Sequence, residues 1–407
     1  MDQDINFNTN ISTGPFDSNE KDNLSSECQE EEGYTSQKRF TRTTLYLLAM
    51  TISLLGNSAV IMIVRKNRRM RTLTHYLIVN MAVADLLVTI FHMPYKLQIQ
   101  LINRHAVVIG GPVGLLICKL VSYTQDVSIA CSVLALMSIA IDRFMAIVFP
   151  FKRITLLQRT RYVIISLWFV SFLVCSPLLY ANRMEEYQGA FYCYEEWSSL
   201  FDPQTGGQNY TIVQFALFYA LPLFVITVLY TFLVFKIWKR SVPGQAAPGL
   251  RPHRTHSVAK KNLLKLLIII VWVFAASWLP YHVIYFLQFS SDMYINCNVP
   301  ETIMFYCLFV GHANSAINPC VYFLIHKEYR GGLAQLARQV CCLRDLNVCG
   351  CAVRQFFSFD LKAAAERNDY SEYLLHLQKI RKRFWTGIKL LLPEPLQFNH
   401  AVHYNNN

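Results

Sequence analysis

The stretch Ala140-Ile-Asp-Arg-Phe-Met-Ala-Ile-Val-Phe-Pro150 places an acid and a base, Asp142 and Arg143, at the end of a long apolar run. The run before it, Val113–Ile141, holds few charges and exceeds the ~20 residues that a helix needs to cross a bilayer. At the rim of a membrane an unpaired cation is costly. We therefore predict that this segment crosses a membrane and that Arg143 pairs with Asp142 at its end.

The whole chain is apolar enough for a membrane protein. Its 407 residues are 53% hydrophobic, which is more than a soluble core of this size normally carries. Buried helices of a large soluble protein would be shorter and amphipathic. Seven segments have the length and low charge of a membrane span: Thr43–Val64, Thr74–Met93, Val113–Ile141, Tyr162–Tyr180, Thr211–Phe235, Leu263–Phe289 and Thr302–Ile325.

Basic residues in the connectors predict the orientation. Lys and Arg, without acids, concentrate in Arg65–Arg71 after the first span and in Lys236–Lys261 between the fifth and sixth spans. Acids gather in the N-terminal tail and between the fourth and fifth spans. Because positively charged loops stay in the cytoplasm, we expect a plasma-membrane protein with an extracellular N-terminus. The net charge of +12 then reflects topology and lipid contact, and no nucleic-acid partner is expected.

The extracellular side carries the expected modifications. The N-terminal tail, residues 1–42, lacks a long apolar segment, so no cleavable signal peptide is expected. Sequons at Asn10 and Asn23 predict glycosylation. A disulfide between Cys118, at the outer end of the third span, and Cys193 would tie the following outer loop across the bundle and contribute ~2–4 kcal/mol. Whether the other outer candidates, Cys28 and Cys297, also pair stays open.

Polar side chains recur at bilayer depth, where an ionisable group costs ~2.5–3.5 kcal/mol on insertion scales. They could simply form hydrogen bonds between helices. They could instead line one shared cavity, in which Asp85 takes up a sodium ion or a proton. The residues concerned are Asn57, Asp85, Ser132, Asn314, Ser315 and Asn318.

Each span also carries a short motif, and the motifs follow a fixed order. They are Asn57, the MAVAD that ends at Asp85, Asp142-Arg143-Phe144, Trp168, Pro222 with Tyr230, Phe274 with Trp278-Leu-Pro280, and Asn318-Pro-Cys-Val-Tyr322. Over about residues 43–342 the chain resembles the rhodopsin class of G-protein-coupled receptors. Phe144 and Ser277 depart from the Tyr and Cys that are common there.

The resemblance implies an all-α membrane protein, a seven-transmembrane helix bundle with a short interfacial eighth helix. The expected parts are an extracellular glycosylated tail (1–42), the bundle (43–325), an interfacial helix (326–342) and a cytoplasmic tail (343–407). Cys341 and Cys342 are the expected acylation sites of the interfacial helix. No enzymatic activity is expected, and no cofactor apart from an allosteric sodium ion.

The resemblance also implies a two-state switch. When the sixth span swings outward, Arg143 leaves Asp142, turns toward Tyr230 and Tyr322, and receives the C-terminal helix of a G-protein α subunit. Prolines at the hinges bend their helices. The other switch residues are Phe274, Trp278, Pro280, Asn318 and Pro319, and the family's sodium site corresponds to Asp85, Ser132, Asn314 and Asn318. No other metal site is expected.

The third span indicates the ligand class. An opsin needs a Lys in the seventh span for retinal, but His312 stands at that position. Amine receptors carry an Asp seven residues after the residue that corresponds to Cys118, and this chain has Gln125 there. Asp126 is turned by ~100° around the helix. This pattern resembles the neuropeptide receptors for orexin, neuropeptide Y, galanin and the Arg-Phe-amide peptides.

Gln125 offers one acceptor and two donors, which matches the C-terminal carboxamide of an amidated peptide. Acidic outer loops would attract a cationic peptide. With Gln125, the expected ligand-binding residues are Tyr123, Glu195, Glu196, Gln214, Tyr281, His282, Tyr285 and His312.

Other classes remain as alternatives. A small-amine receptor is the first, and it would require Asp126 to face the ligand. A transporter or channel would show internal repeats or charged pathway residues, and the chain has no repeat. An intramembrane hydrolase would need paired groups at one depth, whereas Asp85 and Asp126 belong to different spans. The peptide, the G-protein subtype and the oligomeric state stay open.

The C-terminal tail is interpreted separately. In Leu374–Pro393, apolar residues recur at helical spacing among basic ones: Leu377, Ile380, Phe384, Ile388 and Leu391. Such a helix would lie on anionic lipid or bind calmodulin. Because the tail has few Ser and Thr residues, tight capture by arrestin is not expected.

Overall fold

The computed structural model describes residues 35–102, 106–107, 109–149, 160–187, 189–197, 202, 205–239, 251–290 and 301–343. The chain forms two compact units, Met1–Leu333 and Ala334–Asn407, and the bundle belongs to the first. Several predictions lie outside the described residues: those for Asn10, Asn23, Cys28, Cys297 and the tail helix at 374–393. Cys341 and Cys342 lie in a described helix, but their side chains do not belong to the described part.

Within the part of the chain that the structure describes, seven helical segments are long and apolar enough to cross a membrane, as predicted. In chain order the helices are α2 (Ser36–Lys66), α3 (Leu73–Leu87), α4 (Met93–Ile102), α5 (Gly111–Val148), α6 (Thr160–Cys175), α7 (Pro177–Ala181), α8 (Gly206–Phe215), α9 (Leu221–Lys239), α10 (Arg251–Ser290), α12 (Glu301–Ile325) and α13 (Lys327–Leu343). Helices α3 and α4 together form the second span, α6 and α7 the fourth, and α8 and α9 the fifth. A 3-10 turn, Arg68–Met70, lies between the first two spans.

The first helix begins earlier than the tail boundary at residue 42 predicted. It starts at Ser36, where the Thr35 hydroxyl caps it by accepting from the Lys38 amide. Arg42, the last residue of the predicted tail, is only 1% exposed. Its guanidinium donates to Gln100 Oε1 at 3.4 Å and to Thr302 Oγ1 at 3.0 Å. A buried, hydrogen-bonded charge is compatible with a helix that continues toward the chain's N-terminus.

Irregular helical turns lie beside two prolines, Pro94 and Pro222. A single π turn, Ala216–Ala220, joins α8 to α9 just before Pro222, and another, Val88–His92, joins α3 to α4 just before Pro94. A proline cannot donate a backbone hydrogen bond and its ring clashes with the preceding turn, and a π turn is one way to absorb both effects. Pro280 and Pro319 lie inside the continuous helices α10 and α12.

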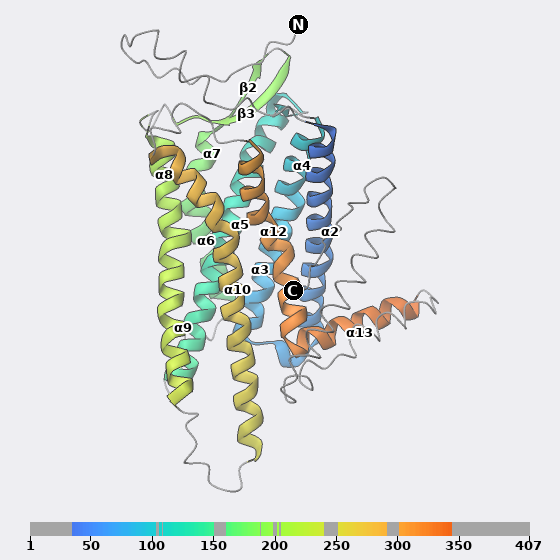
Figure 1. Ribbon diagram of the computed structural model, residues 1–407, viewed down its shortest axis with the longest axis vertical. Helices are drawn as coiled ribbons and strands as arrows, with labels where there is room; N and C mark the ends of the chain where they lie inside the picture. Colours follow the sequence, from blue (N-terminus) through green and yellow to red (C-terminus); the bar gives the residue numbers. More distant parts are fainter. Residues whose placement is uncertain are drawn as a thin grey trace, which may run out of the picture. The chain divides into compact units, whose positions relative to one another are not determined.

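Helix α5 lies at the centre of the bundle (Figure 1). It packs against α3, α6 and α9, while α12 packs against both α2 and α10. Close approach depends on a small residue at one crossing, because a Cβ on Gly56 of α2 would lie 2.6 Å from the Pro319 ring of α12. Asn57 reinforces this crossing by donating to the Ser315 carbonyl at 2.9 Å.

A small antiparallel sheet covers one end of the bundle, which the all-helical prediction did not include. The strands are β1 (Ala106–Val107), β2 (Asn182–Tyr187) and β3 (Ala190–Glu195), in the order β1-β3-β2. Figure 1 shows the β2–β3 hairpin beyond the ends of the helices. Gly189 supplies the positive φ, 75°, that this tight turn uses. Strand pairing lets the acidic loop satisfy its backbone groups without a helix.

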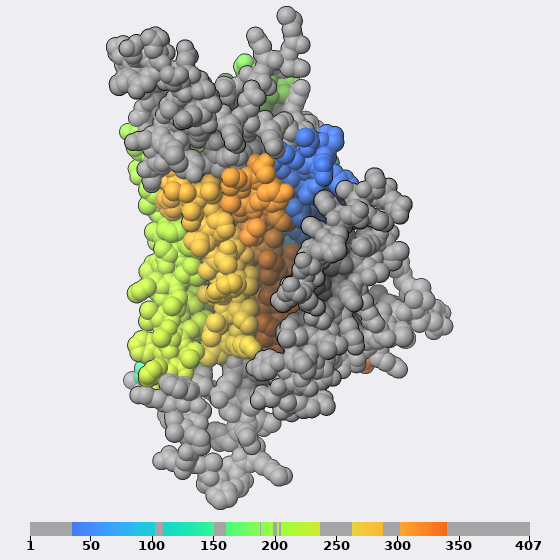
Figure 2. Space-filling view, in the orientation of Figure 1, coloured from blue at the N-terminus to red at the C-terminus, as the bar shows by residue number. Residues whose placement is uncertain are grey.

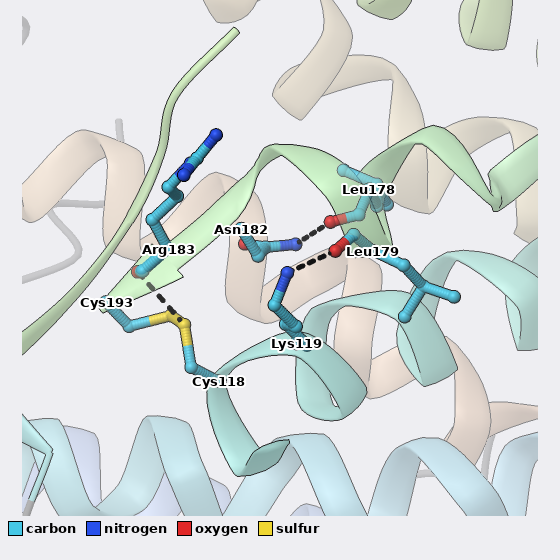
Figure 3. Close-up of a disulfide and its surroundings, with 7 residues drawn as sticks. All are labelled: Cys118, Lys119, Leu178, Leu179, Asn182, Arg183 and Cys193. Carbon is cyan, nitrogen blue, oxygen red and sulfur yellow. Dashed lines mark hydrogen bonds between the residues drawn. A yellow bond between two sulfur atoms is a disulfide. The ribbon is translucent and has the colours of Figure 1, made fainter. Parts of the chain in front are cut away.

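The predicted disulfide between Cys118 and Cys193 is confirmed and anchors the sheet to α5 (Figure 3). Beside it, Lys119 donates to the Leu179 carbonyl, and Asn182 donates to the Leu178 carbonyl at 2.8 Å. We call this end of the bundle the disulfide end and the opposite one, where α5 carries Asp142 and Arg143, the Arg143 end.

Large apolar side chains cover the outside of the bundle. Examples are Phe224 and Phe232 on α9 and Trp272 on α10, which are 68%, 62% and 71% exposed. Figure 2 shows one such face, formed by α9, α10, α12 and α2. A belt of this kind would be unfavourable in water but is suited to lipid. The chain is therefore a multi-pass membrane protein.

Candidate functional site

Gln125 lies at the centre of a hydrogen-bonded network near the disulfide end. Its Oε1 is 3.0 Å from His312 Nε2 on α12, and its Nε2 donates to Asp126 Oδ1 at 3.3 Å. The other Asp126 oxygen accepts from Gln214 Nε2 of α8 at 3.0 Å. Gln214 also donates to the Tyr210 hydroxyl at 2.6 Å. The network thus joins the third, fifth and seventh spans through buried or half-buried polar groups.

His312 extends this network into the core. It is 1% exposed, and its Nδ1 is 3.1 Å from the Tyr46 hydroxyl of α2. One tautomer satisfies both contacts, with Tyr46 donating to Nδ1 and Nε2 donating to Gln125. The imidazole also lies 4.8 Å from the His92 ring and 6.3 Å from the Trp278 ring. Side chains of the first, second and third spans and the predicted switch residue Trp278 of the sixth therefore meet around His312.

Helix α10 provides an aromatic wall beside the network. Ring centroids of Trp278 and Tyr281 are 6.0 Å apart, and those of Tyr281 and Tyr285 are 5.8 Å apart. The Tyr285 hydroxyl accepts from Thr211 of α8 at 3.2 Å. His282 packs between helices, with its ring tilted against that of Tyr219 at a centroid distance of 4.6 Å. These contacts hold α10 against α8 at the same end as Gln125.

Tyr123, which was also predicted to bind the ligand, makes its contacts with α6. Its hydroxyl donates to the Phe172 carbonyl of α6 at 3.0 Å, and its ring packs 6.1 Å from that of Phe172. Two positions further along an α-helix correspond to a rotation of ~200°. Tyr123 and Gln125 therefore occupy opposite faces of α5.

The sequence interpretation also undervalued Asp126 and missed Tyr210. Asp126 was set aside because it is turned away from Gln125, yet α8 lies on that side and supplies Gln214. The signal that could have found it was the pairing of an acid in the third span with an amide in the fifth. The ring of Tyr210 packs against that of Trp197, which follows β3, with the ring centroids 4.9 Å apart.

The two predicted ligand acids, Glu195 at the end of β3 and Glu196 directly after it, have different surroundings. Glu196 pairs with Arg183 at 3.3 Å, so it is engaged within the hairpin region. Glu195 Oε2 accepts from Trp197 Nε1 at 3.4 Å. Desolvation of its carboxylate by the surrounding protein and the nearby charge of Asp126 raise the pKa of Glu195, although the residue as a whole keeps an exposed surface. Glu195 is therefore near enough to Asp126 to feel its charge.

A cavity lined by both apolar and polar side chains lies deeper, between the third, sixth and seventh spans and α3. All four residues predicted for a sodium site line it: Asp85, Ser132, Asn314 and Asn318. Asn318 donates to Asp85 Oδ2 at 3.0 Å and to Asn314 Oδ1 at 3.1 Å. Trp278 and His312 also line the cavity, so it adjoins the Gln125 network.

The cavity fits a small cation by size and by donor type. Its volume, about 20 Å³ as the space open to the centre of a water-sized sphere, exceeds the ~10–15 Å³ that one water requires. Among the described residues, two buried oxygens in it have no hydrogen-bond partner, Ser128 Oγ and Asn318 Oδ1. Carboxylate, hydroxyl and amide oxygens are the ligands that hard cations prefer.

At the Arg143 end the charged pair is formed as predicted. The Arg143 guanidinium donates to Asp142 Oδ2, and Thr74 of α3 donates to the same oxygen at 3.2 Å. The two predicted receivers of Arg143 are buried, and the hydroxyls of Tyr230 and Tyr322 have no hydrogen-bond partner among the described residues. The ring of Tyr322 packs 5.5 Å from that of Tyr329, at the start of α13. Phe274 and Trp278 are also buried in α10, further toward the disulfide end.

Comparisons with known proteins agree with this arrangement of helices and motifs. Residues 56–322 match the profile described as 7 transmembrane receptor (rhodopsin family). The chain is 30% identical to a QRFP-like peptide receptor of Branchiostoma floridae over 72% of this chain and 76% of that protein. It is 31% identical to the Substance-K receptor of Homo sapiens over 74% and 72%, and 28% identical to the RYamide receptor of Drosophila melanogaster over 74% and 65%. The ordered motifs, the bundle and these matches together mean that this chain belongs to the rhodopsin family of seven-transmembrane receptors.

Proposed function

We propose that this protein is a plasma-membrane receptor that binds an extracellular peptide and promotes nucleotide exchange on a heterotrimeric G protein. Its N-terminus and disulfide end face the outside, and its Arg143 end faces the cytoplasm. The named relatives are receptors for peptides, which supports a peptide ligand here. The single observation that carries the ligand class is the hydrogen-bonded network around Gln125.

The network suits a C-terminal carboxamide. Gln125 and Gln214 each carry one acceptor and two donors, and they are joined through the Asp126 carboxylate. A terminal amide of the ligand can replace internal hydrogen bonds of this network one for one, so it enters without leaving polar groups unpaired. The aromatic wall of Tyr281 and Tyr285 then packs the preceding side chain of the peptide.

Two acids favour a cationic residue near the amide. Asp126 and Glu195 are close enough for the charge of Asp126 to raise the pKa of Glu195. A positive side chain of the ligand placed between them would relieve their repulsion. The ligand that fits best is therefore an amidated peptide with an Arg or Lys near its C-terminus.

The position of Asp126 also supports a second candidate function, a receptor for small amines. Its carboxylate faces the network and is half-buried, so it could pair with an ammonium group. The peptide interpretation remains the better one because both Asp126 oxygens already accept from amide groups.

Signal transfer would use contacts already present. A ligand that engages Gln125 changes the hydrogen bond to His312, and His312 lies beside Trp278 on α10. Outward movement of α10 then frees Arg143 from Asp142, and the unpartnered hydroxyls of Tyr230 and Tyr322 can receive it. A sodium ion held by Asp85, Ser132, Asn314 and Asn318 would stabilise the resting arrangement.

The experiment that tests the proposal is a screen of amidated peptides on cells that express this chain with a promiscuous G protein. Calcium release reports activation. We expect potent activation by a small set of amidated, cationic peptides and none by their free-acid forms. Activation by biogenic amines and by no peptide would overturn the peptide assignment.

For the C-terminal tail we propose contact with anionic lipid or calmodulin through Leu374–Pro393, which lies outside the described residues. Acylation at Cys341 or Cys342 would hold α13 at the membrane surface.

A further inference from the structure

Three potential metal ligands meet at the Arg143 end, away from the sites described above. They are His75 in the first turn of α3, His326 between α12 and α13, and Glu328 in the first turn of α13. One ligand atom from each lies within 4.8 Å of the others. His75 Nε2 is 3.9 Å from Glu328 Oε2, and the two imidazole centroids are 6.0 Å apart.

The two imidazoles present nitrogens that the described residues do not satisfy. His75 is 7% exposed, and its Nε2 has no hydrogen-bond partner among the described residues. The same holds for His326 Nδ1. The 3.9 Å separation from Glu328 is too long for a hydrogen bond. Buried nitrogens of this kind are rare in folded proteins and call for a partner.

The other nitrogen of His75 is already held in the way that metal-binding histidines require. His75 Nδ1 lies 2.8 Å from the Thr72 hydroxyl. If Nδ1 carries the proton and donates to Thr72, Nε2 keeps its lone pair and the ring is fixed in orientation. Tyr329 packs against both imidazoles, with centroids 6.0 Å from His75 and 5.5 Å from His326. The ligands are thus positioned before any ion arrives.

The structure assigns to His75, His326 and Glu328 a binding site for a divalent transition-metal ion, with Zn²⁺ as the ion that fits best. Two imidazoles and one carboxylate, with water in the fourth position, form a ligand set that zinc commonly takes. Metal–ligand distances of about 2.0–2.2 Å in a tetrahedron place ligand atoms about 3.4 Å apart. The Glu328 side chain, which is 46% exposed, has to move by only about half an ångström to close its 3.9 Å gap to His75.

A bound ion would join the start of the second span to the segment that follows the seventh. Thr74, the neighbour of His75, donates to Asp142, and Tyr329, the neighbour of Glu328, packs on Tyr322. Within the described part of the chain, His92 and His312 also approach each other, but both ring nitrogens of His312 already have partners. The cluster of His75, His326 and Glu328 is therefore the better site for an exchangeable metal.

The test uses the purified full-length receptor, titrated with Co²⁺ as a spectroscopic substitute for Zn²⁺. We expect d–d absorption bands typical of nitrogen and oxygen ligands, displaced by Zn²⁺ in competition. Thiolates of the cysteine-rich tail would instead give an intense sulfur-to-cobalt charge-transfer band. Because losing even an outer-shell partner weakens metal binding by about 10–100-fold, losing a ligand in His326→Asn should weaken it by at least about 100-fold.

Glu328→Gln keeps the size of the side chain at an exposed position, so it tests the site without endangering the fold, and it should weaken binding at least about tenfold. Lys327→Ala, its exposed neighbour in α13, is the matched control and should bind Co²⁺ as the wild type does. Zn²⁺ should also raise the thermal unfolding midpoint of the wild type and of Lys327→Ala, but not that of Glu328→Gln. Absence of the nitrogen and oxygen bands in the wild type, or equal Co²⁺ affinity of wild type, His326→Asn and Glu328→Gln, would overturn the assignment.

Discussion

Gln125 and His312 are 187 positions apart in the sequence, yet Gln125 Oε1 and His312 Nε2 lie 3.0 Å apart. Because His312 also contacts Tyr46 and lies near Trp278, this one hydrogen bond connects the proposed ligand site to the first, sixth and seventh spans. A change at Gln125 therefore reaches the proposed switch without any intermediate side chain beyond His312.

Removing the Gln125 side chain tests the carboxamide site. Gln125→Ala leaves His312, Asp126 and the ligand amide with unpaired groups, at a cost of about 1–3 kcal/mol. Peptide potency should fall by about 5- to 150-fold while surface expression holds. Tyr123→Phe is the control, since its hydroxyl bonds to Phe172, and its potency should match the wild type. An unchanged Gln125→Ala response would contradict the site.

Asp126→Asn separates peptide from amine ligands. The carboxylate accepts from both Gln125 and Gln214, so an amide in its place sets one donor against another. We expect a loss of peptide potency comparable to that of Gln125→Ala, about 5- to 150-fold. If amines are the ligands, Asp126→Asn abolishes the response and Gln125→Ala alters it little. Dose–response curves of both variants against peptides and amines decide between these outcomes.

Breaking the charged pair should release the switch. Asp142→Asn removes the partner of Arg143 and weakens the bond to Thr74, and the lost stabilisation of the resting state is about 1 kcal/mol. Basal nucleotide exchange should rise about fivefold, measured with a non-hydrolysable GTP analogue in membranes. Ser138→Ala in the same helix removes only the hydrogen bond that the Ser138 hydroxyl donates to the Leu134 carbonyl, so basal exchange of this variant should stay at the wild-type level.

Sodium should oppose agonist binding through the Asp85 cavity. In wild-type membranes, adding sodium chloride should weaken agonist affinity, whereas an equal concentration of a larger organic cation should not. Asp85→Asn removes the charge but keeps the hydrogen bonds that Asn318 makes nearby, and its agonist affinity should no longer respond to sodium. Wild-type affinity that is indifferent to sodium would rule out this role.

Agonist binding should depend on pH through Glu195. Its pKa is raised by desolvation of the carboxylate and by the charge of Asp126, so the carboxylate gains a proton at a higher pH than an ordinary glutamate does. Since only the ionised form attracts a cationic ligand, affinity should fall as the pH drops from neutral through this raised pKa. Glu195→Gln should have weaker affinity at neutral pH and a flatter pH profile. Equal pH profiles of wild type and variant would exclude Glu195 as a ligand group.

The sequence determined the architecture because hydropathy and length are local properties. Seven apolar segments follow from the cost of burying charges in lipid, and the ordered motifs from Asn57 to Tyr322 identify the family. The disulfide between Cys118 and Cys193 also followed from the sidedness of the connectors. The sequence did not show that the first helix extends back to Ser36, because the burial of Arg42 depends on its contacts with Gln100 and Thr302.

The tertiary structure decided which side chains meet. One residue along a helix changes the direction of a side chain by ~100°, so the partner depends on which helix lies on that side. For this reason the sequence alone did not show that Asp126 meets Gln214 of α8 or that Tyr123 meets Phe172 of α6. Likewise, His75 and His326 lie far apart in the sequence, in the second span and after the seventh. Their ring nitrogens come together because the start of the second span packs beside the end of the seventh.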